Sequence, residues 1–275
     1  MTKDKKILVI PRRLVFVKFL EVPALPHPEI KKMVQAEAVK YISYPKEEMN
    51  IGYRDLGSYK DGFSSLMLVV GNKHIIQEAM RKKEALGFHI DAIRLHTELL
   101  YLFLLKKELV SKDRLMLVIH IGKKDSEIMI IDNLRPIFSK GFKNSESFLE
   151  EMERSVLAYE KDRYGPDIDD ILVIYSSEIN IEEARPHLER NFTIPVSFYE
   201  YSEDLNAIDL PVKIDLYSRE IRRSKPDSRK KQVNMVTCFL IVFILILIFM
   251  YISFKAHEKK GPLDMSLSIL DRIHG

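Results

Sequence analysis

Over the first 210 residues, hydrophobic and polar positions alternate between two patterns. Short apolar runs rich in β-branched and aromatic residues are typical of strands, whereas apolar residues that recur every three or four positions are typical of helices. Strands are expected at Ile7–Ile10, Leu14–Glu21, Met49–Arg54, Leu66–Val70, Phe88–Arg94, Leu115–Ile121, Glu127–Asp132, Leu134–Lys140, Ile171–Tyr175 and Ile194–Tyr199. Helices are expected at Pro28–Ile42, Lys73–Leu86, Thr97–Leu109, Ser145–Arg163 and Ile181–Arg190. Two strand-rich blocks, each followed by helices, indicate an α/β fold with two lobes.

A third pattern begins at Val233, where the chain becomes continuously apolar as far as Phe254. This run contains no charged residue, glycine or proline. At 1.5 Å per residue, it would be about 33 Å long as a helix, enough to cross a hydrocarbon core of about 30 Å. The sequence therefore predicts one transmembrane helix at Val233–Phe254.

Basic residues gather on the N-terminal side of this run and predict its orientation. The residues expected to anchor it are Arg222, Arg223, Arg229, Lys230 and Lys231. Positively charged residues remain on the cytoplasmic side of a membrane, so we expect a single-pass protein of the inner membrane with residues 1–232 in the cytoplasm.

The charge distribution narrows the classes of partner. Residues 1–210 hold 31 Lys and Arg against 34 Asp and Glu, whereas residues 211–232 hold 8 against 3. The basic excess lies beside the predicted span, where it fits anionic lipid, and no nucleic-acid partner is expected. The only cysteine, Cys238, lies within the span, and the histidines show no ligand spacing, so neither disulfides nor a metal site is expected.

Two stretches, Ala36–Tyr53 and Leu115–Ile131, resemble PilM of type IV pilus machines and the cytoplasmic actin-like domain of GspL from type II secretion. The resemblance covers most of residues 5–200. It implies an actin-like fold with two RNase H-type lobes around a nucleotide cleft, in a degenerate form. It also implies a small inserted subdomain at about Met49–Arg94.

The nucleotide-binding loops of this family are altered in the present sequence. The first loop normally supplies an Asp and a Gly, and here Pro11 and Arg13 occupy those positions. Proline removes an amide donor and arginine fills the space of a phosphate, so this loop is expected to be absent. The second loop keeps Gly122 and Ser126, but His120 replaces its acidic residue.

The third family motif, a Gly-Gly turn beneath the adenine, is replaced by Ser176 and Ser177. With these changes the resemblance implies a pseudo-ATPase without catalytic residues and without bound ATP or Mg²⁺. Weak nucleotide binding without turnover is the alternative. His120 is expected to be a hydrogen-bonded structural residue.

The segment before the predicted span carries a second resemblance. Lys213–Arg223 is similar to the cytoplasmic N-terminal stretch of PilN. The residues that match the sequence pattern of that stretch are Ile214, Asp215, Leu216 and Glu220. In that family the stretch docks into a groove of PilM, and here it would dock within one chain, at high effective concentration. An ordinary amphipathic juxtamembrane segment is the alternative.

Together these features predict a PilM-like domain at 1–210, a basic linker at 211–232, the span at 233–254 and the start of a helical stalk at 255–275. The expected function is a non-catalytic scaffold that couples a motor ATPase to membrane and periplasmic components of a pilus or secretion system, with a homo-oligomer possible. A membrane-tethered actin-like ATPase and a single-span signalling protein are the alternatives.

Overall fold

The computed structural model describes residues 6–144, 148–162, 167–202, 205, 211–216, 248, 250 and 251. Contacts divide the chain into two units, Met1–Ile221 and Arg222–Gly275, and all elements below belong to the first. No helix within the described part of the chain is long and apolar enough to cross a membrane. Most of the predicted span, the stalk, Glu220 and the five basic anchor residues lie outside the described residues.

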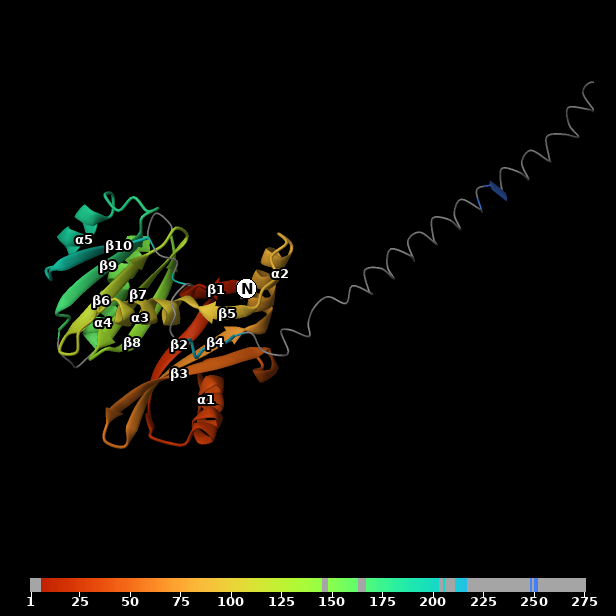
Figure 1. Ribbon diagram of the computed structural model, residues 1–275, viewed down its shortest axis with the longest axis horizontal. Coiled ribbons are helices and arrows are strands. Elements are labelled where there is room, and N and C mark those ends of the chain that lie inside the picture. The colour runs from red at the N-terminus through yellow and green to blue at the C-terminus, as the bar shows by residue number, and fades with distance from the viewer. Residues whose placement is uncertain are drawn as a thin grey trace, which may run out of the picture. The chain divides into compact units, whose positions relative to one another are not determined.

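The larger sheet forms the second half of the first unit (Figure 1), with strand order β10-β9-β6-β7-β8. Its strands are β6 (Leu115–Ile121), β7 (Asp125–Asp132), β8 (Arg135–Lys143), β9 (Asp170–Ser176) and β10 (Val196–Tyr201). β6, β7 and β8 are antiparallel neighbours, whereas β9 and β10 run parallel to β6. The turn between β7 and β8 places Asn133 and Leu134 at positive φ, as a two-residue hairpin turn requires.

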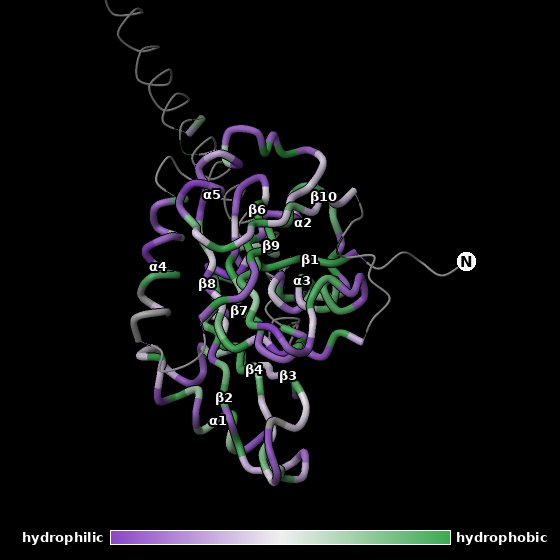
Figure 2. The backbone as a smooth tube through the Cα atoms, turned by 90° about the vertical axis from the view of Figure 1, so that its left-hand side faces the viewer, coloured by the Kyte–Doolittle hydropathy of each residue, from purple (hydrophilic) through white to green (hydrophobic). Residues whose placement is uncertain are grey.

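Helices cover both faces of this sheet. Helix α3 (His96–Lys106) packs on one face against Val118 and Ile174. Helices α4 (Phe148–Asp162) and α5 (Arg185–Asn191) supply the core of the other face. Because both faces are covered, β6 is buried along its whole length, which explains why its sequence is apolar except for His120. The central strands accordingly appear as hydrophobic traces in the interior (Figure 2).

A three-stranded antiparallel sheet dominates the first half, with strand order β2-β4-β3. Its strands are β2 (Val15–Pro23), β3 (Met49–Lys60) and β4 (Phe63–Asn72). Helix α1 (His27–Tyr41) buries Ile30, Val34 and Ala38 against one face of this sheet. The short turn η2 (Lys46–Glu48) precedes β3.

The other face of this sheet packs against a separate pair of parallel strands, β1 (Ile7–Ile10) and β5 (Ala92–Leu95). Helix α2 (Lys73–Glu84) contributes Ile76 and Met80 to the same core. The side chain of Asn72 begins this helix by accepting a hydrogen bond from the His74 amide at 2.8 Å. The helix ends at Glu84, and Gly87 lies three residues beyond with a φ of 82°, a conformation that glycine favours.

The expected strands and helices are present, with ends displaced by up to six residues, the largest difference being β3, which continues from Arg54 to Lys60. The two halves, however, are not copies of each other. The turn η1 (Arg12–Leu14), which begins after Pro11, separates β1 from β2, and the two strands enter different sheets. Nor do the strands of the range 49–94 pair only with one another, since β4 pairs with β2 and β5 pairs with β1.

Candidate functional site

The segment 211–216 lies against the first half of the domain, next to β3, β5 and the beginning of α3. Its side chains alternate, with Ile214 and Leu216 only 1% and 0% exposed, while Lys213 and Asp215 face outward. Both apolar side chains join the core formed by β1, β2, β4, β5 and α2. This alternation is that of an extended chain with one buried face.

A buried carboxylate holds the backbone of this segment. Glu98, in the first turn of α3, is 0% exposed, and its Oε1 accepts a hydrogen bond from the Lys213 amide at 2.8 Å. Its Oε2 accepts another from the Ile214 amide at 3.1 Å. Nη1 of Arg54 balances the charge at 2.7 Å from Oε1 and also donates to the Pro211 carbonyl at 3.0 Å. The pair therefore binds main-chain groups of the segment rather than its side chains.

Two further contacts fix the register of the segment. The Leu216 amide donates to the Ile93 carbonyl of β5 at 3.1 Å, and the side-chain amide of Asn50 donates to the Leu216 carbonyl. At Gly52 of β3, a Cβ atom would lie 3.0 Å from Cγ2 of Ile214, so glycine provides room for that side chain. We call Asn50, Gly52, Arg54, Ile93 and Glu98 the docking site.

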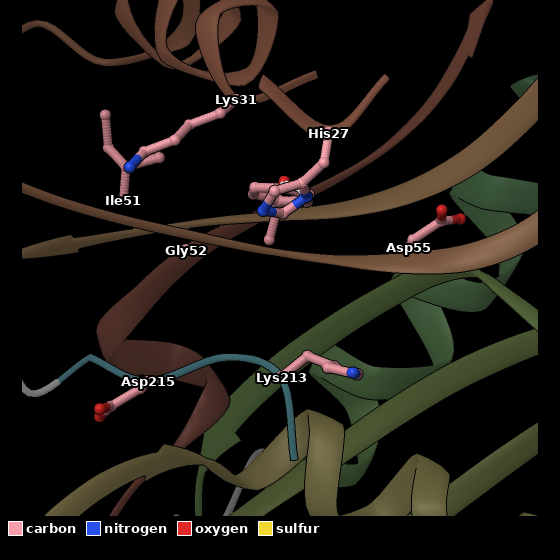
Figure 3. Close-up of a pocket in the computed structure, with 8 residues that line it drawn as sticks. His27, Lys31, Ile51, Gly52, Asp55, Lys213 and Asp215 are labelled. Carbon is pink, nitrogen blue, oxygen red and sulfur yellow. Dashed lines mark hydrogen bonds between the residues drawn. The ribbon is translucent and has the colours of Figure 1, made fainter. Parts of the chain in front are cut away.

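A cavity of about 430 Å³ lies beside the docked segment. Figure 3 shows α1, with His27 and Lys31, and the segment, with Lys213 and Asp215, on opposite sides of β3. The remaining lining residues, Ile51, Gly52, Tyr53 and Asp55, belong to β3. The Tyr53 hydroxyl lies 2.7 Å from Nδ1 of His27, which ties α1 to this strand.

An ion pair lies where the PilM family has its first phosphate-binding loop. Pro11 begins η1, and its carbonyl accepts a hydrogen bond from the Leu14 amide at 3.0 Å. The guanidinium of Arg13 pairs with Asp125 at the start of β7. Arg13 thus meets the turn between β6 and β7, where the resemblance places the second loop.

The second loop is held by a side chain that sequence reasoning did not identify. Asn144 donates to the Gly122 carbonyl at 2.6 Å and accepts from the Ser126 hydroxyl at 2.7 Å. A Cβ atom on Gly122 would lie 2.5 Å from the Asp125 carbonyl oxygen, so the tight turn itself requires glycine. Asn144 therefore binds both the Gly122 carbonyl and the Ser126 hydroxyl.

Ser176 and Ser177 lie in the turn after β9. The Ser177 amide donates to the Tyr201 carbonyl at 3.1 Å, and the Ser176 carbonyl accepts from the Ile179 amide at 2.8 Å. Nζ of Lys123 lies 3.7 Å from Glu178, so this turn adjoins the one between β6 and β7. The residues expected for the second loop and those expected for the third loop therefore lie in two neighbouring turns of the structure.

His120 belongs to a buried polar cluster. Its Nε2 lies 2.9 Å from the Tyr201 hydroxyl, and its ring lies 4.5 Å from that of His96. Nδ1 of His96 in turn lies 2.9 Å from Glu127. Three buried atoms, His120 Nδ1, Glu127 Oε1 and Thr97 Oγ1, have no hydrogen-bond partner among the described residues. Burial, and secondarily the charge of His96, lowers the pKa of His120 well below its usual value of about 6.5.

This lowered pKa predicts acid sensitivity. As pH falls below about 6.5, the unfolded chain binds a proton at His120 that the folded chain does not, so the free energy of unfolding decreases by up to ~1.4 kcal/mol per pH unit. We expect His120→Gln to reduce this dependence between about pH 7 and 5 in urea unfolding. His74→Asn, at an exposed histidine, should leave it unchanged. Equal slopes for the His120 variant and the wild type would contradict the prediction.

Sequence reasoning identified the docked segment but not the residues that hold it. Glu98 does carry a signal, because it is an acidic residue directly before the apolar run Leu99–Leu105. No comparable pattern in the sequence marks Asn50, Arg54 or Asn144. The group that each of them binds lies far away along the chain.

No protein-family model matches the sequence, nor does any curated protein. The structure is similar to a PilM-PilN type IV pilus biogenesis complex, with a TM-score of 0.57 at 14% identity, over 82% of this chain and 77% of that one. This chain has a PilM-like fold. The likeness to PilM expected from the sequence is thereby confirmed at the level of the fold.

Two other solved structures are similar with lower TM-scores. One is a Bacteroides thetaiotaomicron protein with an actin-like ATPase fold and unknown function, with a TM-score of 0.43 at 10% identity, over 72% of this chain and 69% of that one. The other is the cytoplasmic domain of EpsL, an inner-membrane component of the type II secretion system of Vibrio cholerae, with a TM-score of 0.44 at 9% identity, over 73% of this chain and 71% of that one.

Proposed function

We propose that this protein is an inner-membrane assembly component of a type IV pilus or type II secretion-type apparatus. In this proposal the PilM-like domain is a non-catalytic cytoplasmic scaffold, and residues 233–254 anchor it in the membrane. It couples a motor ATPase to membrane and periplasmic components. The observation that carries the proposal is the docked segment 211–216, because a PilN-like peptide occupies a site on a PilM-like domain within one polypeptide.

The docking geometry supports this function. Main-chain hydrogen bonds to Glu98 and Ile93 hold the segment, and two buried side chains set its register. This combination is typical of extended-peptide recognition. The similar solved complex is described as a PilM–PilN assembly, in which the two components are named separately. Here the segment precedes the predicted span by 16 residues, so the domain would be tethered to the membrane.

Capture of a motor ATPase would test the assembly role. We expect the tagged full-length chain, extracted in mild detergent from cells that build pili or secrete protein, to co-purify with the motor ATPase of that system. The matched control is an unrelated single-span protein with the same tag. Absence of the motor from the wild-type capture, in cells where the apparatus is active, would contradict the proposed coupling.

The rival activity, nucleotide hydrolysis, is tested by calorimetric titration of the full-length chain in detergent micelles with ATP and Mg²⁺. We expect no binding heat, because Arg13 pairs with Asp125 and Asn144 binds both Gly122 and Ser126. Thermal unfolding of the same sample establishes that it is folded. Micromolar binding would instead make the domain a nucleotide switch.

A further inference from the structure

Two sheet edges face each other away from the docking site. Among the described residues, β2 pairs only with β4, and β8 pairs only with β7, so each strand has one unpaired edge. β2 and β8 contact each other without forming a ladder. A cavity of about 340 Å³ lies between them, near the lower end of the ~300–1,000 Å³ range of ligand pockets.

The turn η1 determines where these edges separate. At Gly141 of β8, a Cβ atom would lie 2.4 Å from the Arg13 amide nitrogen and 2.8 Å from Cβ of Arg12, so η1 packs directly on β8 there. Nε of Arg12 donates to the Ser139 hydroxyl at 2.7 Å, and Nη2 donates to the Ser139 carbonyl at 2.8 Å. Beyond this contact the cavity walls are Val17 to Phe19 on β2 and Ile137 to Lys140 on β8.

The charged groups of this cavity are all positive. Arg12, Lys18 and Lys140 line it, and no carboxylate does. Within the described part of the chain, neither Lys18 nor Lys140 forms an ion pair with an acidic group, whereas the negative charge of Glu127 acts on Arg12. Nζ of Lys140 donates to the Ser155 hydroxyl at 2.7 Å, and Nζ of Lys18 lies 5.4 Å from the centre of the Tyr41 ring. These two partners, a hydroxyl and an aromatic ring, carry no negative charge.

The other walls are apolar, formed by Val17, Phe19, Ile137 and Phe138. We propose that this cavity binds an extended segment of a partner protein in which acidic side chains alternate with apolar ones. Main-chain groups of the segment pair with the open edge of β2 or β8, its acidic side chains meet Lys18 and Lys140, and its apolar side chains contact the walls. A hollow between two strand edges fits a strand better than it fits a flat lipid surface.

This inference does not rest on the proposed function, because the cavity shares no residue with the docking site or with the cavity beside the docked segment. Its failure would leave the docked segment unaffected. Conversely, a failed motor capture would leave the peptide-binding prediction in place.

The test is selection from a displayed library of random peptides on the full-length chain in detergent micelles. We expect the enriched peptides to alternate acidic and apolar residues. Synthetic copies should bind Lys18→Glu/Lys140→Glu about tenfold or more weakly than the wild type. Lys32→Glu/Lys112→Glu, with the same charge change at two exposed lysines outside the cavity, should bind like the wild type. Hydrogen exchange should show new protection at residues 17–19 or 137–140.

Three results would overturn the proposal: enrichment of peptides without acidic residues, equal binding by the charge-reversed variant, or protection confined to other strands. Binding to phosphatidylserine vesicles that the charge reversal abolishes, without enrichment of acidic peptides, would assign the cavity to lipid instead. If the charge-reversed variant fails to fold, Lys18→Gln/Lys140→Gln keeps the comparison possible, because it removes the charges without reversing them.

Discussion

Replacing Ile214 and Leu216 together by aspartate is expected to release the docked segment while the domain remains folded. Full burial of such side chains contributes about 1.5–3 kcal/mol each, and the aspartates would remain in water rather than enter the core. A loss of about 3 kcal/mol raises the open population on the order of a hundredfold. Hydrogen exchange of the backbone amides of residues 213–216, measured by mass spectrometry, should accelerate correspondingly.

The matched control makes the same chemical change at exposed leucines. Leu86 and Leu157 are 71% and 63% exposed, so Leu86→Asp/Leu157→Asp adds the same charges without removing a buried contact. Amide exchange at residues 213–216 should then proceed at the wild-type rate. Unchanged amide protection of these residues in the Ile214/Leu216 variant would refute the docking of the segment.

Glu98→Ala is expected to cause the second large effect, a loss of about 3–5 kcal/mol in the free energy of unfolding. The substitution leaves the guanidinium of Arg54 without its carboxylate and removes the acceptor for the Lys213 and Ile214 amides. Urea unfolding measures the loss. Glu98→Gln should lose less, because its side-chain carbonyl can still accept one amide hydrogen bond.

Two further variants distinguish the loss of the Glu98 contacts from the loss of a negative charge in general. Glu183→Ala, at an exposed position in a turn, should change stability by no more than about 0.5 kcal/mol. Glu98→Ala combined with Ile214→Asp/Leu216→Asp should be less destabilising than the sum, since both changes act on the same contact. Full additivity would show that Glu98 stabilises the domain independently of the segment.

The fold was predictable wherever a sequence pattern is compatible with only one type of secondary structure. The short apolar runs of β4, β7 and β9 are such patterns, and those strands are present. The pairing of β1 with β5 was not predictable, because more than 80 residues separate the partners and four-residue strands carry little register information. The resemblance to PilM provided the overall arrangement, which no local pattern contains.

For the candidate site, the sequence indicated the peptide but not its receptor. Ile214 and Leu216 alternate with charged residues, so their burial could be expected. The docking site, by contrast, combines Asn50, Ile93 and Glu98 from three elements, and only the folded chain brings them together. The same holds for Asn144, whose bonds to Gly122 and Ser126 depend on the β7–β8 pairing.

Encoding the segment and its docking site in one polypeptide has a consequence for gene dosage. Each translated chain supplies one receptor and one ligand, so uneven expression cannot leave docking sites empty or peptides in excess. A peptide of similar sequence on another protein would have to displace a tethered competitor, whose effective concentration with a short linker is in the millimolar range. The fused arrangement therefore isolates this pairing from related peptides produced in the same cell.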